Sequence, residues 1–242
     1  WGDEAFSAYL SSKTIPEILS IISRDTSPPL YNITERIAFE MFGNSEVVIR
    51  GLSFFYYCLA IVFVYKIGSY LWGKRTGAIA ALLSFLNPFF FIYAFEGRMY
   101  SIMALGVAAS MYFFLKKKPI AYAIATAWAL YSHHFAIFAV IIQCIWFLKE
   151  VVFGNRKEML PMFKGFVITG LLYLPWLPIL YKQVKMVQGG FWLGKPNIFD
   201  LRNMIYEYLG QGVTHRLAIF ALYATFAALA LRKWHKDINK SC

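Results

Sequence analysis

Long apolar runs separated by short polar junctions dominate the chain, and this pattern predicts helices that cross a membrane. A spanning helix needs about 20 apolar residues, and runs of roughly 17 to 25 occur. The run over residues 119–148 lacks acids, lysine and arginine and is too long for one untilted crossing. Because Tyr131-Ser132-His133-His134 interrupts it near its middle, we predict two short helices there. The seven predicted spans are residues 51–72, 76–95, 99–115, the two halves of 119–148, 165–181 and 217–231.

Lysine and arginine gather at every second junction, and this alternation predicts how the helices are oriented. Cytoplasmic loops of membrane proteins are enriched in these two residue types. We therefore assign the basic junctions to the cytoplasm and the other junctions to the extracytoplasmic side. The residues concerned are Lys74, Arg75, Lys116, Lys117, Lys118, Lys149, Arg156, Lys157, Lys164, Arg232, Lys233 and Lys236.

Composition supports the same class. The 242 residues are 59% hydrophobic, 19% aromatic and 15% charged, which is more apolar surface than one soluble core needs. The net charge of +11 comes from short clusters at helix ends and forms no continuous patch, so we expect no nucleic-acid partner. Cys58, Cys144 and Cys242 have neither metal-ligand spacing nor a disulfide framework. We predict an all-α, polytopic transmembrane helix bundle in a single domain over residues 1–242.

Residues 1–50 are predicted to form the first extracytoplasmic segment, with amphipathic helices on the membrane surface. Apolar residues recur at helical spacing after Pro16, which predicts a helix over residues 14–23. A Pro-Pro turn precedes a second amphipathic stretch over residues 30–41. Two such helices beside a bundle would roof a cavity. We expect residues 182–216 to form a late extracytoplasmic loop. We also expect a longer natural chain, with a further span ahead of Trp1 and a continuation past Cys242.

Charged residues on the predicted extracytoplasmic side are the candidates for chemistry. Asp3 and Glu4 lie at a membrane edge, where an oriented carboxylate serves as a general base for a hydroxyl nucleophile; the alternative is a pair of solvated acids. Arg98 offers a planar fork of donors suited to phosphate, and the alternative is that it pairs with Glu96 or reaches the lipid headgroups.

Two later segments carry weaker signals. Adjacent helical histidines point about 100° apart, so His133 and His134 reach one metal ion only if the helix breaks there. One of them is a candidate to line the cavity, and the alternative is an interfacial histidine. The late loop offers cations and stacking surfaces for a phosphate and a sugar, and the alternative is an ordinary basic and aromatic belt. These candidates are Lys182, Lys185, Lys195, Trp192 and Tyr206.

Several short motifs, taken in order, resemble the integral-membrane glycosyltransferases of the GT-C superfamily. The similar group contains the protein mannosyltransferases, the lipid A aminoarabinose transferase and the RgtA/B/C/D-like enzymes. The motifs are Trp1-Gly2-Asp3-Glu4, Asp25-Thr26-Ser27-Pro28-Pro29-Leu30-Tyr31, Phe42-Gly43, Glu46 to Arg50, Asn87-Pro88-Phe89, Glu96-Gly97-Arg98-Met99-Tyr100, Tyr131-Ser132-His133 and Phe191-Trp192-Leu193-Gly194-Lys195-Pro196.

The resemblance implies inverting transfer of a sugar from a polyprenyl-phosphate donor to a lipid, protein or polysaccharide acceptor on the extracytoplasmic side. It makes Asp3 the catalytic carboxylate, Glu4 the neighbour that shapes the site, and Arg98 a ligand of the carrier phosphate. The other residues that it assigns to substrate binding are Glu96, Tyr100, Asp25, Pro28, Pro29, His133 and Lys195. Ser27 stands where family members often have histidine. No cofactor is assigned, and dependence on a divalent metal stays open.

Two other classes of membrane protein are alternatives to an enzyme. A transporter or flippase of lipid-linked sugars predicts ionisable residues near the middle of the membrane and related halves with broken helices. Apart from Lys66, the charges here cluster at helix ends, and no repeat is visible. A non-catalytic scaffold has no need for a carboxylate, an arginine and a Pro-Pro turn on one face. The pattern therefore favours an enzyme.

Overall fold

The structure, a computed structural model, describes residues 2–188, 197–208, 217, 219–225 and 227–228. Every regular element in this part of the chain is helical, as the all-α prediction requires. The chain forms two compact units. The first comprises Trp1–Phe85 and Ile92–Trp192, and the second comprises Leu86–Phe91 and Leu193–Cys242.

Three helices precede the bundle in the first unit: α1 (Gly2–Ser11), α2 (Ile15–Ile22) and α3 (Leu30–Phe42). Glu17 caps α2, because its carboxylate accepts the backbone N–H of Thr14 at 2.8 Å. Gly43, at φ +86°, ends α3 in a conformation that other residues rarely adopt. The two predicted amphipathic helices are confirmed, whereas helix α1 was not predicted.

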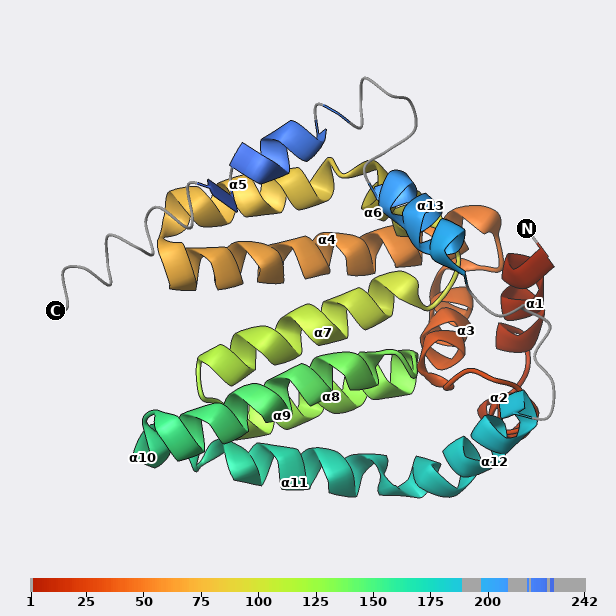
Figure 1. Cartoon of the computed structure of the whole chain (residues 1–242). Helices are drawn as coiled ribbons and strands as arrows, with labels where there is room; N and C mark the ends of the chain where they lie inside the picture. The colour runs from red at the N-terminus through yellow and green to blue at the C-terminus, as the bar shows by residue number, and fades with distance from the viewer. Residues whose placement is uncertain (1, 189–196, 209–216, 218, 226, 229–242) are drawn as a thin grey trace, which may run out of the picture. The chain divides into compact units, whose positions relative to one another are not determined.

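The bundle of the first unit contains α4 (Glu46–Trp72), α5 (Lys74–Phe85), α7 (Tyr100–Leu115), α8 (Pro119–Ser132), α9 (Ala136–Phe153) and α11 (Met162–Tyr173). Helix α4 packs beside α5 and α7, and α8 packs beside α7 and α11 (Figure 1). A Cβ atom on Gly106 would lie 2.8 Å from Ala129 Cα, so only glycine allows the observed approach of α7 to α8. Short α10 (Arg156–Met159), η1 (Leu174–Trp176) and α12 (Leu177–Gln188) flank α11.

The interruption at residues 131–134 separates two helices, as predicted. Helix α8 ends at Ser132, His133 adopts extended backbone angles, and α9 begins at Ala136. A buried polar chain then ties these helices together: the Tyr122 hydroxyl donates to Gln143 Oε1 at 3.0 Å, and Gln143 Nε2 donates to Ser110 Oγ at 3.0 Å. Hydrogen bonds of this kind join helices where apolar burial alone gives no preference.

Three helical stretches of the described residues are long and apolar enough to cross a membrane: Glu46–Trp72, Ala136–Phe153 and Arg156–Gln188, which comprises α10, α11, η1 and α12. The pair Lys74–Phe85 and Pro88–Phe95, bent by 64°, makes a fourth if it counts as one broken span. The membrane bundle is confirmed, but fewer helices than the seven predicted crossings meet the length criterion. The reason is that α7 and α8 contain only 16 and 14 residues, about 24 and 21 Å of helix. The last predicted span, over residues 217–231, falls largely outside the described residues.

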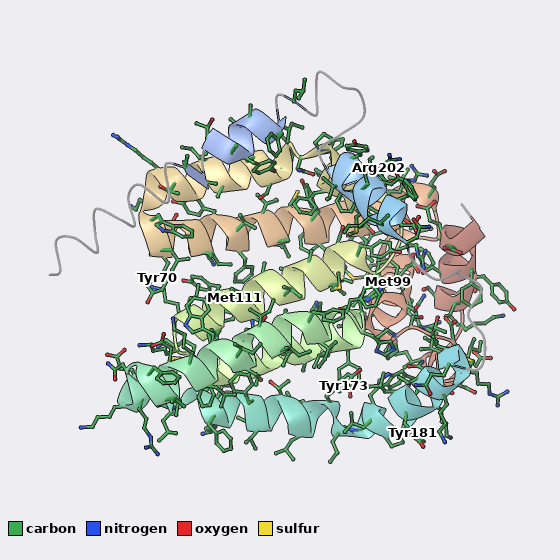
Figure 2. The ribbon with its side chains drawn as sticks, viewed as in Figure 1. Tyr70, Met99, Met111, Tyr173, Tyr181 and Arg202 are labelled. Atoms are coloured by element: carbon green, nitrogen blue, oxygen red, sulfur yellow. The ribbon has the colours of Figure 1, made fainter. Side chains whose placement is uncertain are left out.

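Aromatic and aliphatic clusters hold the first unit together from end to end. Met99 packs against a cluster of Tyr31, Tyr56 and Ile102, and Met111 packs against a second cluster that contains Phe114. These two methionines lie near opposite ends of α7 (Figure 2). A third cluster joins α1 and α2 to the bundle; its buried members are Leu10, Ile18, Ile22, Ala129, Leu130, Ala136, Tyr173 and Trp176.

The predicted cytoplasmic junctions also meet. Lys117 pairs with Glu158, and the Lys116 ammonium lies 4.0 Å from the centre of the Tyr70 ring. Three junctions that the charge pattern assigned to one side of the membrane therefore lie together at one end of the bundle.

The described part of the second unit is small. Asn87 precedes α6 (Pro88–Phe95), of which Pro88–Phe91 belong to this unit, and its Oδ1 accepts the Phe90 N–H at 3.1 Å. Helix α13 (Ile198–Tyr208) begins with a similar cap, in which Asn197 Oδ1 accepts the Phe199 N–H at 2.8 Å, and Asp200 in turn accepts the Asn197 N–H at 2.8 Å. The segment predicted as the late loop, residues 182–216, thus contains the end of α12 and the whole of α13.

Candidate functional site

The first turn of α1 meets the loop between α6 and α7. Arg98 Nη1 lies 2.5 Å from Asp3 Oδ2, and the guanidinium also lies 5.4 Å from the centre of the Tyr100 ring. The Asp3 side chain is 69% exposed, whereas the Arg98 side chain is 25% exposed. The structure therefore brings together the carboxylate and the cation that the sequence singled out, and it pairs Arg98 with Asp3 rather than with Glu96.

Glu4 has different surroundings from Asp3. Its Oε1 accepts the backbone N–H of Gly97 at 2.8 Å, and its Oε2 lies 3.8 Å from Arg50 Nη2. Only 12% of the Glu4 side chain is exposed. Glu4 thus anchors the loop that carries Arg98, while its neighbour Asp3 faces solvent.

Gly97 is required for this arrangement because the loop passes close to α4. A Cβ atom at this position would lie 2.2 Å from Ile49 Cγ2 and 3.5 Å from Glu4 Oε1. Arg50 was not among the predicted site residues, although it completes the surroundings of Glu4 and also pairs with Glu46 at 2.8 Å.

Glu96 adds a third carboxylate to the cluster. Burial raises the pKa of Glu96, nearby Arg98 opposes that rise, and Glu4 and Asp3 add to it. Three acids and two guanidinium groups consequently share one small region. A bound anion would gain from the two cations and would compete with the acids for them.

His133 lies beside this cluster from the break between α8 and α9. Its ring is 6.0 Å from that of Tyr100, centre to centre. Burial, together with the positive charges of His134 and Arg98, lowers the pKa of His133 to about 4. Because Nδ1 accepts the Phe135 N–H at 3.1 Å, the neutral ring carries its proton on Nε2. His133 therefore presents a neutral hydrogen-bond donor near neutral pH.

His134 is engaged elsewhere. Its Nε2 lies 3.0 Å from Gln183 Oε1, and Gln183 Nε2 donates to the carbonyls of Ile22 and Ser27. Since the Gln183 oxygen can only accept, His134 donates this bond. Gln183 is buried and joins α12 to the turn before the two prolines; nothing in the local sequence marked it, because its partners lie far away in the chain.

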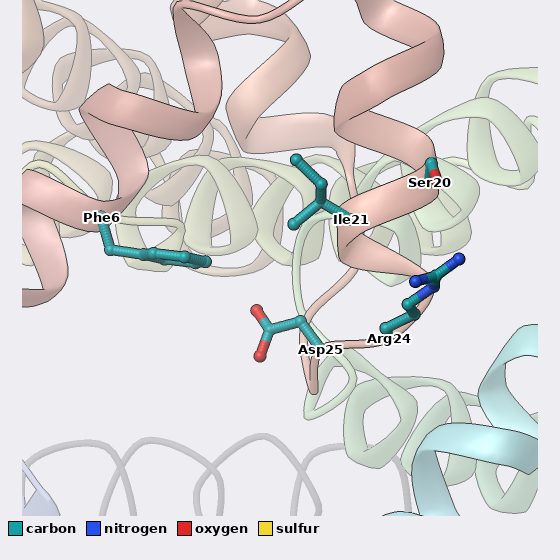
Figure 3. Close-up of a pocket in the computed structure, with 5 residues that line it drawn as sticks. All are labelled: Phe6, Ser20, Ile21, Arg24 and Asp25. Atoms are coloured by element: carbon teal, nitrogen blue, oxygen red, sulfur yellow. The ribbon is translucent and has the colours of Figure 1, made fainter.

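Asp25, Pro28 and Pro29 belong to that turn. The two prolines are buried, and Asp25 accepts a hydrogen bond from Ser27 Oγ at 3.1 Å. Asp25 also lines an open pocket of about 400 Å³ with Phe6, Ser20, Ile21 and Arg24. Figure 3 shows the Phe6 ring and the Asp25 carboxylate on opposite sides of this opening. Phe6 follows Asp3 by three residues on α1, so the two share a helix face.

Two predictions about positive charge remain, the phosphate ligand Lys195 and a metal site. Lys195 lies outside the described residues. Among the residues that the structure describes, no group of three histidine, cysteine or acidic side chains is arranged to hold a metal ion.

Comparison with known proteins identifies a family for this chain. A family model described as dolichyl-phosphate-mannose-protein mannosyltransferase matches residues 26–181. The match includes Arg98 and His133 and begins after Asp3 and Glu4. No curated protein and no solved structure gives a significant match.

Proposed function

This chain belongs to the dolichyl-phosphate-mannose-protein mannosyltransferase family, and on that basis we propose that it transfers a sugar from a polyprenyl-phosphate carrier to an acceptor hydroxyl with inversion at the anomeric carbon. Family membership makes the protein an integral-membrane glycosyltransferase with a lipid-linked donor. We propose, in addition, that the reaction inverts the anomeric centre, and we propose the carrier, the acceptor class and the roles of individual residues.

The pairing of Asp3 with Arg98 carries the proposal. Inverting transfer needs a base for the acceptor hydroxyl and a cation for the charge that grows on the departing phosphate. Asp3 supplies an exposed carboxylate and Arg98 a guanidinium in direct contact with it. One donor molecule bound at Arg98 would therefore place its anomeric carbon within reach of a hydroxyl held by Asp3.

In the proposed step, the acceptor oxygen attacks the anomeric carbon from the face opposite the phosphate. The hydroxyl proton passes to Asp3, and a carbon–oxygen bond forms to the acceptor. The bond between the anomeric carbon and the phosphate oxygen breaks, and its electron pair stays on the phosphate. Arg98 stabilises that charge as polyprenyl phosphate leaves. A single displacement of this kind inverts the anomeric centre.

In this proposal, Asp3 and Arg98 contact each other in the enzyme before the donor binds. Exposed ion pairs contribute only about 0–1 kcal/mol, so a phosphate group can displace the carboxylate at little cost. Donor binding would then release Asp3 from Arg98 at the moment when the acceptor needs a base. His133 and Tyr100 border the same region and are proposed to contact the donor, with Glu96 close to its sugar hydroxyls.

The pocket beside Asp25 is the proposed approach for the acceptor. Phe6 on α1 lines it, three residues after Asp3, and offers an aromatic surface of the kind that contacts sugars and apolar chains. We place this whole region on the extracytoplasmic side, because the bundle end with Lys117 and Glu158 is the basic one.

The test is a transfer assay in native membranes with lipid-linked sugar donors, read by the mass of the product. A product that combines one sugar with an acceptor supports the proposal and identifies both. Loss of this product in Asp3→Asn, at unchanged protein abundance, supports the role of the carboxylate. If vesicles that contain the purified protein move the lipid-linked sugar across their membrane without transferring the sugar to an acceptor, the protein is instead a flippase.

A further inference from the structure

We infer that Glu35 is a positioning residue that holds α1, and with it Asp3, in the orientation that transfer requires. This inference rests on the proposed function for its catalytic consequence. Its structural part, the anchoring of α1 by Glu35, can be tested independently.

Glu35 lies in the middle of α3 and is completely buried. Its Oε2 accepts hydrogen bonds from Ser7 Oγ at 2.9 Å and Ser11 Oγ at 2.5 Å, and its Oε1 accepts from the Tyr31 hydroxyl at 3.3 Å. Burial raises the pKa of Glu35, and these three hydroxyl donors oppose the rise. The network therefore replaces much of the hydration that the carboxylate has lost.

The two serines connect Glu35 to the candidate base. Asp3, Ser7 and Ser11 follow one another at intervals of four residues, so they lie along one face of α1. Glu35 binds this face at its second and third turns, while Arg98 meets it at the first. Rotation of α1 about its axis would therefore have two effects at once: it would break the serine contacts with Glu35, and it would move Asp3 away from Arg98.

Asn32 reinforces the same contact. Its Nδ2 donates to Ser7 Oγ at 3.0 Å and to Ser11 Oγ at 3.2 Å, so each serine hydroxyl can donate to Glu35 while it accepts from Asn32. On the other side, the Tyr31 hydroxyl lies 3.4 Å from Ser53 Oγ on α4. The network thus runs from α1 through α3 to the bundle, and α1 is oriented by directional bonds as well as by apolar packing.

Packing alone does not require an acidic side chain at this buried position. Apolar replacements of buried polar groups are often neutral or stabilising. The adjacent cation Arg36 is engaged with the Lys13 carbonyl and with Glu40. The donors that surround Glu35 come mainly from α1, which is the element that carries Asp3.

The structural test is hydrogen–deuterium exchange of the purified full-length protein in detergent. We expect Glu35→Ala to speed amide exchange in residues 2–11 by about tenfold or more while exchange in α7 stays unchanged. Glu35→Gln retains one acceptor oxygen and should give a smaller increase. Glu40→Gln is the matched control, because Glu40 lies on the same helix with an exposed side chain. Unchanged exchange in residues 2–11 of Glu35→Ala would overturn the inference.

The kinetic test uses the same variants with a lipid-linked donor. Because misplacement of a reacting group by about 1 Å can cost about 100-fold, we expect Glu35→Ala to lower kcat by about 100-fold and Glu35→Gln by about tenfold. The donor KM should stay within about twofold, since Arg98 and the donor contacts are intact. Equal kcat values in Glu35→Gln, Glu35→Ala and the wild type would refute the catalytic part.

The remaining outcomes are separable. If Glu35→Ala exchanges faster throughout, including α7, it is unfolded, and Glu35→Gln then decides both tests. If the wild type transfers no sugar from any lipid-linked donor, the proposed function fails, whereas exchange in residues 2–11 still decides whether Glu35 anchors α1.

Discussion

Arg98 and Asp3 are 95 positions apart in the chain, and their side chains meet at 2.5 Å. The contact joins the first turn of α1 to the loop that follows α6. Glu4 strengthens the same junction through the Gly97 N–H. A base candidate and a phosphate-binding candidate therefore share one boundary between a surface helix and the bundle, and this junction is the basis of the predictions below.

Replacing Asp3 by Asn should remove the base and leave the fold intact. The side chain is 69% exposed, so the change costs little stability. General-base catalysis contributes about 10²–10⁴-fold, and we expect kcat to fall within that range. The measurement is product formation from a lipid-linked donor, normalised to protein abundance, with Glu40→Gln as the control. Wild-type turnover in Asp3→Asn would exclude Asp3 as the base.

Substitutions of Arg98 should separate charge from geometry. Arg98→Ala removes the cation and should lower kcat/KM by about 10²–10³-fold, because the departing phosphate loses its counter-charge. Arg98→Lys retains a charge but loses the planar fork, and an intermediate loss of about tenfold is expected. Arg156→Ala, at another junction of the chain, is the control. Equal activity of the Lys and Ala variants would mean that charge at this position does not support transfer.

The close approach at Gly97 should make even alanine harmful there. The added methyl group would collide with Ile49 Cγ2 and displace the loop that positions Arg98. We expect Gly97→Ala to lower activity about 10- to 100-fold, whereas Gly51→Ala, where a Cβ meets nothing within 4 Å, should be neutral. Ile49→Ala in the Gly97→Ala background should restore part of the activity. If that double variant is no better than Gly97→Ala, the collision is not the cause.

The pH dependence of stability should carry a contribution from His133. Its pKa in the folded protein is about 4, below the ordinary value of 6.5, so the unfolded chain binds the proton first. This contribution to stability is complete above pH 6.5 and is lost as the pH falls toward 4. Thermal unfolding in detergent at pH 7.5 and pH 5 should show a smaller drop in Tm for His133→Gln than for the wild type. Identical drops would show that His133 does not titrate in this way.

The sequence by itself determined the class of protein and most of the helices of its bundle. Apolar runs of membrane-spanning length, basic clusters at alternate junctions and the helix break at residues 131–134 depend on neighbouring residues only, so they can be predicted without a fold. The short motifs also pointed to Asp3, Glu4 and Arg98 as candidates. They indicated the family as well, and the match over residues 26–181 shows that family.

Only the tertiary structure decided what these residues contact. Asp3 and Glu4 are neighbours of the same charge, yet one is exposed beside Arg98 and the other is held by Gly97 and Arg50. Glu35 and Gln183 drew no attention in the sequence, because single polar residues in helices are usually solvated. Their burial and their partners depend on how α1, α3 and α12 pack. Packing is set by contacts between residues far apart in the chain, and no local pattern records it.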